Sequence, residues 1–124
     1  MKNFSSLSAI QEAIQSGQTT CVQLVDYYLN RIQEFQHLNA FLEVFSEEAQ
    51  ARALEIDAKI AAGNAGKLAG MVIAVKDNIV IKDHKVSASS KILENFESLF
   101  TATAVQRLLA EDAIIIGRTN CDEF

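Results

Sequence analysis

Lys76 is the residue of this sequence whose position best suits chemistry. It directly follows the apolar, β-branched run Met71-Val72-Ile73-Ala74-Val75, which predicts a short strand buried on both faces. Ligands of open α/β sheets collect at the carboxyl ends of strands, where Lys76 would lie. A lysine partly shielded from water there loses basicity, and its neutral amine can act as a general base. Position alone also fits a solvated lysine that opens a turn with Asp77 and Asn78, so both interpretations stay open.

A lysine base needs a nucleophile, and the sequence offers none at a spacing known for this chemistry. No lysine has a serine three positions before it, which would place both on one helical face, and no Gly-x-Ser-x-Gly elbow occurs. Ser87, Ser89 and Ser90 cluster in a polar stretch, where turn and capping roles are expected for their hydroxyls. Spacing along the sequence therefore identifies no serine as the nucleophile that Lys76 would activate.

The other polar side chains predict no metal or nucleotide site. His37 and His84 have no cysteine or carboxylate at ligand spacing and are expected on surface loops. The adjacent Asp122 and Glu123 fit capping or solvation. The glycine-rich stretch 63–70 lacks the phosphate-loop pattern and precedes its strand, which argues against nucleotide binding.

Composition indicates one globular domain or part of one. The chain has 124 residues, of which 49% are hydrophobic, and no apolar run is long enough to span a membrane. A net charge of −5 disfavours direct binding to nucleic acid. The distant Cys21 and Cys121 predict neither a disulfide framework nor a zinc site, and a reducing cytoplasm is the expected setting.

Hydrophobic periodicity divides the chain into a helical half, residues 1–62, and the start of an α/β core, residues 63–124. The first half predicts a helix that Gly17 ends, a second helix capped by Thr19 or Thr20, a short strand at 41–45, and a third helix capped by Ser46. The second half predicts the strand 71–75, a helix at 103–110 with Val105, Leu108 and Leu109 buried, and a fully buried strand 113–116 that Gly117 ends. This order predicts a βαβ unit within an α/β fold.

Three runs resemble a known family. Residues 66–78, with the strand leading into Lys76-Asp77-Asn78, resemble the entry to the amidase-signature domain. Residues 89–96 and 114–124 are similar to the A subunits of aspartyl/glutamyl-tRNA amidotransferases, a branch of that family. The resemblance implies an α/β/α fold with a mixed sheet, preceded by N-terminal helices, of which residues 1–124 would form the N-terminal part of a single domain.

The resemblance also implies a Ser-cisSer-Lys triad in which Lys76 is the catalytic lysine. Glutamine would be hydrolysed to ammonia, and the ammonia would pass to a B subunit that uses ATP and Mg to amidate misacylated tRNA. A C subunit would hold the other two together. No cofactor or metal is expected in this chain. Both serines follow the last motif in the family, so the 124-residue chain alone is expected to be inactive. A general amidase for small amides and a non-catalytic helical docking module remain as alternatives.

Overall fold

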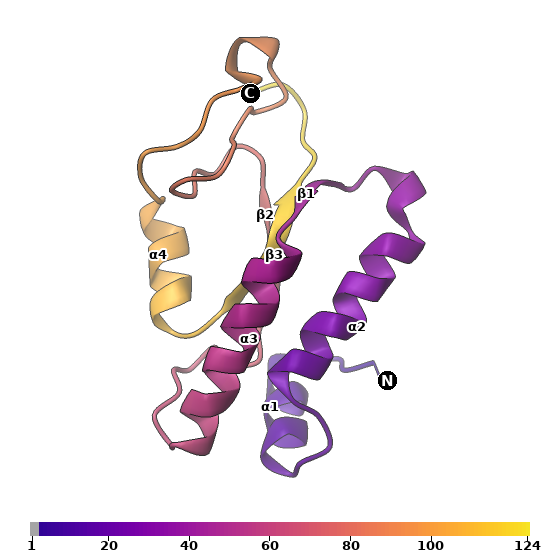
Figure 1. Ribbon diagram of the computed structural model, residues 1–124, viewed down its shortest axis with the longest axis vertical. Helices are drawn as coiled ribbons and strands as arrows, with labels where there is room; N and C mark the ends of the chain where they lie inside the picture. Colours follow the sequence, from indigo (N-terminus) through magenta and orange to yellow (C-terminus); the bar gives the residue numbers. More distant parts are fainter. Residues whose placement is uncertain (1–2) are drawn as a thin grey trace.

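The structure, a computed structural model, describes residues 3–124 and has the α/β fold that the sequence predicts (Figure 1). Helices precede the first strand and surround a three-stranded sheet. In chain order the elements are α1 (Leu7–Gln15), α2 (Cys21–Glu34), the 3-10 helix η1 (Gln36–Leu38), β1 (Phe41–Val44), α3 (Ser46–Ala61), β2 (Val72–Lys76), the 3-10 helix η2 (Lys91–Leu93), α4 (Thr103–Ala110) and β3 (Ile114–Thr119).

Each of the first two helices begins with a hydroxyl cap, and the cap of the second is one of the two residues that the sequence predicts. The hydroxyl of Ser6 accepts a hydrogen bond from the amide of Ala9, and Thr20 accepts one from Gln23, each at 3.1 Å. Gly17 takes the left-handed conformation, with φ of +80°, just after α1. The predicted end of α1 and the predicted start of α2 are therefore confirmed.

The predicted cap of α3 is wrong by one residue. Ser46 is the first residue of the helix, Phe45 occupies the cap position, and no side chain there accepts a hydrogen bond from the helix amides. Glu47 and Glu48 still lie in the first turn, where their charge suits the helix dipole. The sequence contains a good capping residue, but the backbone turns into the helix one position earlier because Phe45 continues hydrogen bonding to β3 through Ile116.

The sheet is mixed, and the strand that comes last in the chain is its central one. The order is β1-β3-β2, with β2 parallel and β1 antiparallel to β3. The segment β2–α4–β3 is therefore the predicted βαβ unit, with two neighbouring parallel strands. In Figure 1, α2 and α4 lie to either side of the sheet and α3 crosses in front of it.

Two predictions about the strands need correction. β2 is an edge strand in the described chain, and its residue Ala74 is exposed, so β2 is not buried on both faces. Gly117 does not end β3 but lies inside it, where a Cβ atom would stand 2.5 Å from the carbonyl oxygen of Glu43. The glycine lets β1 and β3 approach closely, which has nothing to do with ending a strand.

The core lies between the helices of the N-terminal half and one face of β3. Ala49, Ala53 and Ile56 of α3 pack against Ile114 and Ile116 of β3, and all five are buried. In α4 only Val105 is buried, whereas Leu108 and Leu109 are half-buried, contrary to the prediction. A helix of eight residues at the side of a narrow sheet covers too little area to bury three large side chains.

A buried carboxylate joins three segments at the end of the sheet where β3 begins. Asp112 accepts hydrogen bonds from Nζ of Lys59 at 2.7 Å and from the amide of Gly66 at 2.6 Å, and Nη2 of Arg52 lies 3.7 Å away. Burial alone would raise the pKa of Asp112, but the hydrogen bonds from Lys59 and Gly66 and the charges of Lys59 and Arg52 hold it below its ordinary value. This cluster ties α3 to the turns before β2 and β3.

Candidate active site

Lys76 lies where the sequence predicts it, at the carboxyl end of β2. It is the last residue of the strand and pairs in parallel register with Thr119, near the end of β3. Within residues 3–124 its side chain is exposed, so the expected partial shielding from water is not present in the described chain. An exposed amine at a strand tip is open to reacting groups, which suits a residue that must exchange protons.

Asp77, the next residue, is a buried carboxylate that contacts two other segments. Its amide donates to the carbonyl of Thr119 at 3.0 Å, which extends the ladder between β2 and β3 by one residue. Its carboxylate accepts hydrogen bonds from the hydroxyl and the amide of Ser87, and its carbonyl accepts one from the amide of Ala88 at 3.0 Å. Asp77 therefore holds both the neighbouring strand and the hydroxyl-bearing loop that returns to it.

Arg118 completes this cluster from β3. Its Nη1 lies 2.5 Å from Oδ1 of Asp77, and its Nε lies 3.2 Å from Oε2 of Glu43 in β1. The side chain of Arg118 is largely buried, that of Asp77 is fully buried, and that of Glu43 is substantially exposed. One guanidinium thus links all three strands, and its better shielded ion pair is the one beside Lys76.

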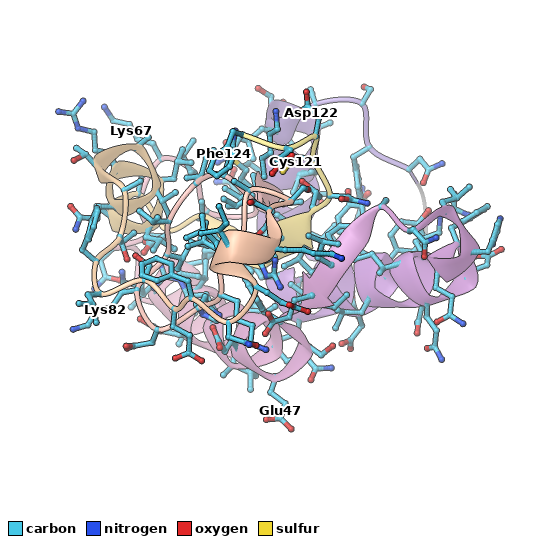
Figure 2. The ribbon with its side chains drawn as sticks, turned by 90° about the horizontal axis from the view of Figure 1, so that it is seen from above. Glu47, Lys67, Lys82, Cys121, Asp122 and Phe124 are labelled. Carbon is cyan, nitrogen blue, oxygen red and sulfur yellow. The ribbon has the colours of Figure 1, made fainter. Side chains whose placement is uncertain are left out.

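The loops after β2 and β3 meet at the same edge of the sheet. The hydroxyl of Ser89 donates to the carbonyl of Cys121, and the amide of Phe124 donates to the carbonyl of Ala88 at 2.9 Å. Ala88 and Ser89 both have positive φ, 48° and 56°, a conformation that these contacts maintain. Figure 2, seen from above, shows Cys121 and Asp122 beside one another near Phe124 in the segment that follows β3.

The predicted turn role is confirmed for the hydroxyl of Ser87, which accepts a hydrogen bond from the amide of Ser89 at 3.3 Å. It is wrong for the hydroxyl of Ser89, which donates to the carbonyl of Cys121, 32 positions later in the chain. Ser90 is buried and precedes η2 without capping it through its side chain. None of these three hydroxyls is therefore placed as a nucleophile that Lys76 could activate.

The prediction of surface loops is right in part for each histidine, because His37 is exposed but lies in η1, and His84 lies in a loop but is half-buried. Nε2 of His84 lies 3.0 Å from Oε2 of Glu48, and its ring packs 4.2 Å from that of Phe45. The partner carboxylate comes from α3, 36 positions earlier in the chain, so spacing along the sequence could not reveal it.

The described chain holds no cluster of metal ligands and no disulfide. Within residues 3–124, no three side chains of histidine, cysteine, aspartate or glutamate are grouped to hold a metal ion. Cys21 and Cys121 are free thiols, one buried and one half-buried. None of the helices in the described part of the chain is both long and apolar enough to cross a membrane.

Asp77 and Arg118 are the residues of this site that the sequence analysis missed. A signal exists for Arg118, since it is a charged residue directly after three isoleucines and a glycine, but the sequence pattern predicts that the strand ends at Gly117. Asp77 fits a solvated turn on sequence grounds. Its burial depends on Arg118, 41 positions later, and no local pattern reports that pairing.

Comparison with known proteins assigns the family. Residues 23–124 match the family described as Amidase. Together with the mixed sheet and the lysine at the end of β2, this match shows that the chain belongs to the amidase-signature family.

Two curated relatives and one solved structure illustrate the similarity. Both relatives are A subunits of glutamyl-tRNA(Gln) amidotransferases. The chain is 46% identical over 123 residues to the one from Chlorobium phaeobacteroides (strain DSM 266) and 47% identical over 122 residues to the one from Chlorobaculum tepidum. Each match covers 98% of this chain and about a quarter of the relative, 26% and 25%. The native peptide amidase from Stenotrophomonas maltophilia superposes with a TM-score of 0.88 at 29% identity, over 96% of this chain and 25% of that one. The chain thus spans about a quarter of the length of the proteins it matches.

Proposed function

We propose that residues 1–124 are the N-terminal part of the amidase domain of a glutamine-hydrolysing A subunit of a glutamyl-tRNA(Gln) or aspartyl-tRNA(Asn) amidotransferase, and that Lys76 is its catalytic lysine. The names of the curated relatives support this assignment, since the matches extend over nearly the whole chain. The observation that carries the role of Lys76 is its place: an exposed amine at the carboxyl end of β2, at the edge of the sheet where the loops after β2 and β3 meet.

In this proposal Lys76 moves protons and forms no bond to the substrate. Its neutral amine takes a proton from a bridging serine, which in turn deprotonates the serine nucleophile. The nucleophile attacks the side-chain amide carbon of glutamine, the C–N bond breaks, and the proton returns along the same path to the leaving ammonia. Water then hydrolyses the acyl-enzyme to glutamate. Both serines are supplied by polypeptide outside residues 1–124, which is consistent with the engagement of Ser87 and Ser89 in loop contacts.

The remaining parts of the reaction belong to other components of the proposed complex. Ammonia released at this site passes to a B subunit, which uses ATP and Mg to activate and amidate the misacylated tRNA, and a C subunit joins the two. The acidic balance of this chain, with 16 acidic and 11 basic residues, supports contact with tRNA through the complex instead of through this segment.

A chimera tests the proposal directly. This chain replaces the matching quarter of the Chlorobium phaeobacteroides relative, and ammonia release from glutamine is measured with the purified complex. We expect activity in the chimera, a loss of about a thousandfold or more in Lys76→Ala, and no rescue in Lys76→Arg, because a guanidinium does not give up its proton near neutral pH. Lys82→Ala, at a nearby exposed lysine, is the matched control and retains activity. Full turnover in Lys76→Ala would refute the role of Lys76, and ammonia release by the isolated 124-residue chain would refute its expected inactivity.

The likeness to a peptide amidase supports a second candidate, an amidase for small amides that acts without tRNA. The same chimera separates the two, since amidotransferase function requires that it restore tRNA-dependent amidation and not only amide hydrolysis. A purely non-catalytic docking module is not supported, because the apolar side chains of α1 and α2 that would form its surface, such as Ile14, Val22 and Leu29, pack against the core.

A further inference from the structure

The residues on either side of Lys76 in the chain are fixed in the protein interior. Val75 and Asp77 are both buried, and Lys76 between them is exposed. Successive side chains of a strand point to opposite faces, so the direction of Lys76 is set by how firmly its two neighbours are held. The backbone of Val75 pairs with β3 at Arg118 and its apolar side chain is buried, whereas the side chain of Asp77 is held by an ion pair and hydrogen bonds from two other segments.

We propose that Asp77 and Arg118 are positioning residues for Lys76: a buried, charge-balanced anchor that fixes the direction of its side chain and the path of the loop that follows. The inference rests on the proposed function, because it gives this anchor a purpose only if Lys76 is the catalytic lysine. Arg118 connects this anchor to the central strand, β3. Through its ion pair with Glu43, its cross-strand neighbour, it also connects the anchor to β1.

Asp77 and Arg118 also balance each other's charge. A lone buried carboxylate or guanidinium beside Lys76 would change how readily its amine holds a proton, whereas the pair presents almost no net charge to it. The charged groups on the elements at this edge are Asp77 after β2, Arg118 in β3, Glu43 in β1, and Asp122 and Glu123 in the segment after β3. Of these groups, Asp77 and Arg118 are the ones shielded from water. Removing the charge of either should therefore change how readily the Lys76 amine holds a proton more than removing any of the other charges.

Competitive acetylation of the full 124-residue chain, followed by mass spectrometry across pH, measures this coupling at Lys76. Asp77→Asn removes the buried negative charge and leaves Arg118 paired with the more exposed Glu43, so the reactivity midpoint of Lys76 should move to lower pH. Arg118→Gln leaves the carboxylate unbalanced, so the midpoint should move to higher pH. We expect shifts of about half a pH unit in opposite directions, less than for a fully buried neighbour because Lys76 is exposed. Lys67 and Lys82, exposed lysines in the same molecules, serve as internal references.

Asp112→Asn is the matched structural control. It also removes a buried carboxylate from an ion pair, but at the opposite end of the sheet, so it should weaken the fold without moving the midpoint of Lys76. Glu43→Gln removes a more exposed negative charge from the same network and should give a smaller shift in the direction of Asp77→Asn, even if the buried substitutions prevent folding. Unchanged midpoints in these variants, or shifts equal to that of Asp112→Asn, would overturn the inference.

Kinetics of the chimera separate this inference from the proposed function. Asp77→Asn and Arg118→Gln should lower kcat about tenfold or more and change KM less than about twofold, since a misplaced base slows chemistry without removing a contact to glutamine. Asp112→Asn should keep kcat within about twofold of the parent value. If Lys76→Ala stays active while the labelling midpoints shift, the role of Lys76 fails and the electrostatic coupling stands. If Lys76→Ala is inactive and the midpoints do not move, the positioning role of Asp77 and Arg118 is refuted and the role of Lys76 stands.

Discussion

The carboxylate of Asp57, in α3, accepts a hydrogen bond from the amide of Cys21 at 2.8 Å, and its second oxygen accepts one from Val22 at 3.1 Å. One helix therefore caps the first turn of another, in addition to the local cap from Thr20. The two contacts join α2 to α3 at a point where each has polar groups to satisfy, and they place a negative charge at the positive end of α2.

Removing this cap should destabilise the fold measurably. We expect Asp57→Ala to lower the free energy of unfolding by about 1–2 kcal/mol, because two helix amides lose their acceptor and the helix dipole loses its counter-charge. Urea denaturation followed by circular dichroism measures the change. Asp26→Ala is the control, since Asp26 is exposed and, among residues 3–124, its carboxylate accepts a hydrogen bond only from the side chain of Gln50, at 3.2 Å. Equal stability of the two variants would contradict the capping role.

Burial, together with the carboxylate of Asp57, makes the thiol of Cys21 unreactive. Burial, followed by the charge of Asp57 and a hydrogen bond to it, raises the pKa of the Cys21 thiol to about 12. Only the thiolate reacts with alkylating reagents, so at about pH 8 iodoacetamide should label one cysteine quickly, the half-buried Cys121, and Cys21 only as the chain unfolds. Mass spectrometry of the labelled chain gives both rates. In urea the two rates should converge, and rapid modification of Cys21 in the folded chain would show that the site is open.

Acid should weaken the protein partly through Asp112. The folded state holds the pKa of this carboxyl below its ordinary value, so its contribution is present above about pH 4 and is lost as pH falls through the lowered pKa. We expect Asp112→Asn to cost about 2 kcal/mol near pH 7, with the difference from the parent chain shrinking below about pH 4. Urea titrations at neutral pH and at two acidic pH values measure it. A difference that stays constant across this range would show that the charge of Asp112 is not what matters.

Gly117→Ala should disrupt the sheet. An added Cβ would stand 2.5 Å from the carbonyl oxygen of Glu43 and 2.9 Å from Cδ1 of Phe41, so β1 would have to move away from β3. We expect a loss of about 1–3 kcal/mol, typical of overpacking in a place that cannot relax. Gly63→Asn is the control, because Gly63 has open space around it and asparagine tolerates its positive φ of 77°. Thermal unfolding compares the variants, and a neutral Gly117→Ala would mean that the two strands separate easily.

The fold is predictable from sequence to the extent that it depends on local pattern. Helical spacing, the stop at Gly17 and the threonine cap locate α1 and α2, and the isoleucine run locates β3. The errors about the strands have one cause, namely contacts between distant segments. Gly117 resembles a strand end because the close approach of β1 cannot be seen in the sequence. β2 resembles a fully covered strand because its apolar composition reports a tendency to be buried and not its actual neighbours.

The site follows the same division. Lys76 can be found because an apolar run followed by a lysine is a local signal, and the family resemblance names it independently. The ion pair of Asp77 and Arg118 cannot be found in this way. Its two residues are 41 positions apart, and neither local sequence predicts that their segments pair in the sheet. Electrostatic partners of a residue are a property of the folded sheet, so they become visible only with the structure.

The order β1-β3-β2 has a consequence for the growing polypeptide on the ribosome. Among the described residues each outer strand pairs only with the central one, which is translated after both of them. Until that strand leaves the exit tunnel, the two earlier strands have no hydrogen-bonding partner within the described chain, and the helices made first lack the sheet face on which they rest. Apolar surface of the nascent N-terminal region therefore stays uncovered until β3 emerges. Protection of this region by chaperones is expected to matter most during this interval.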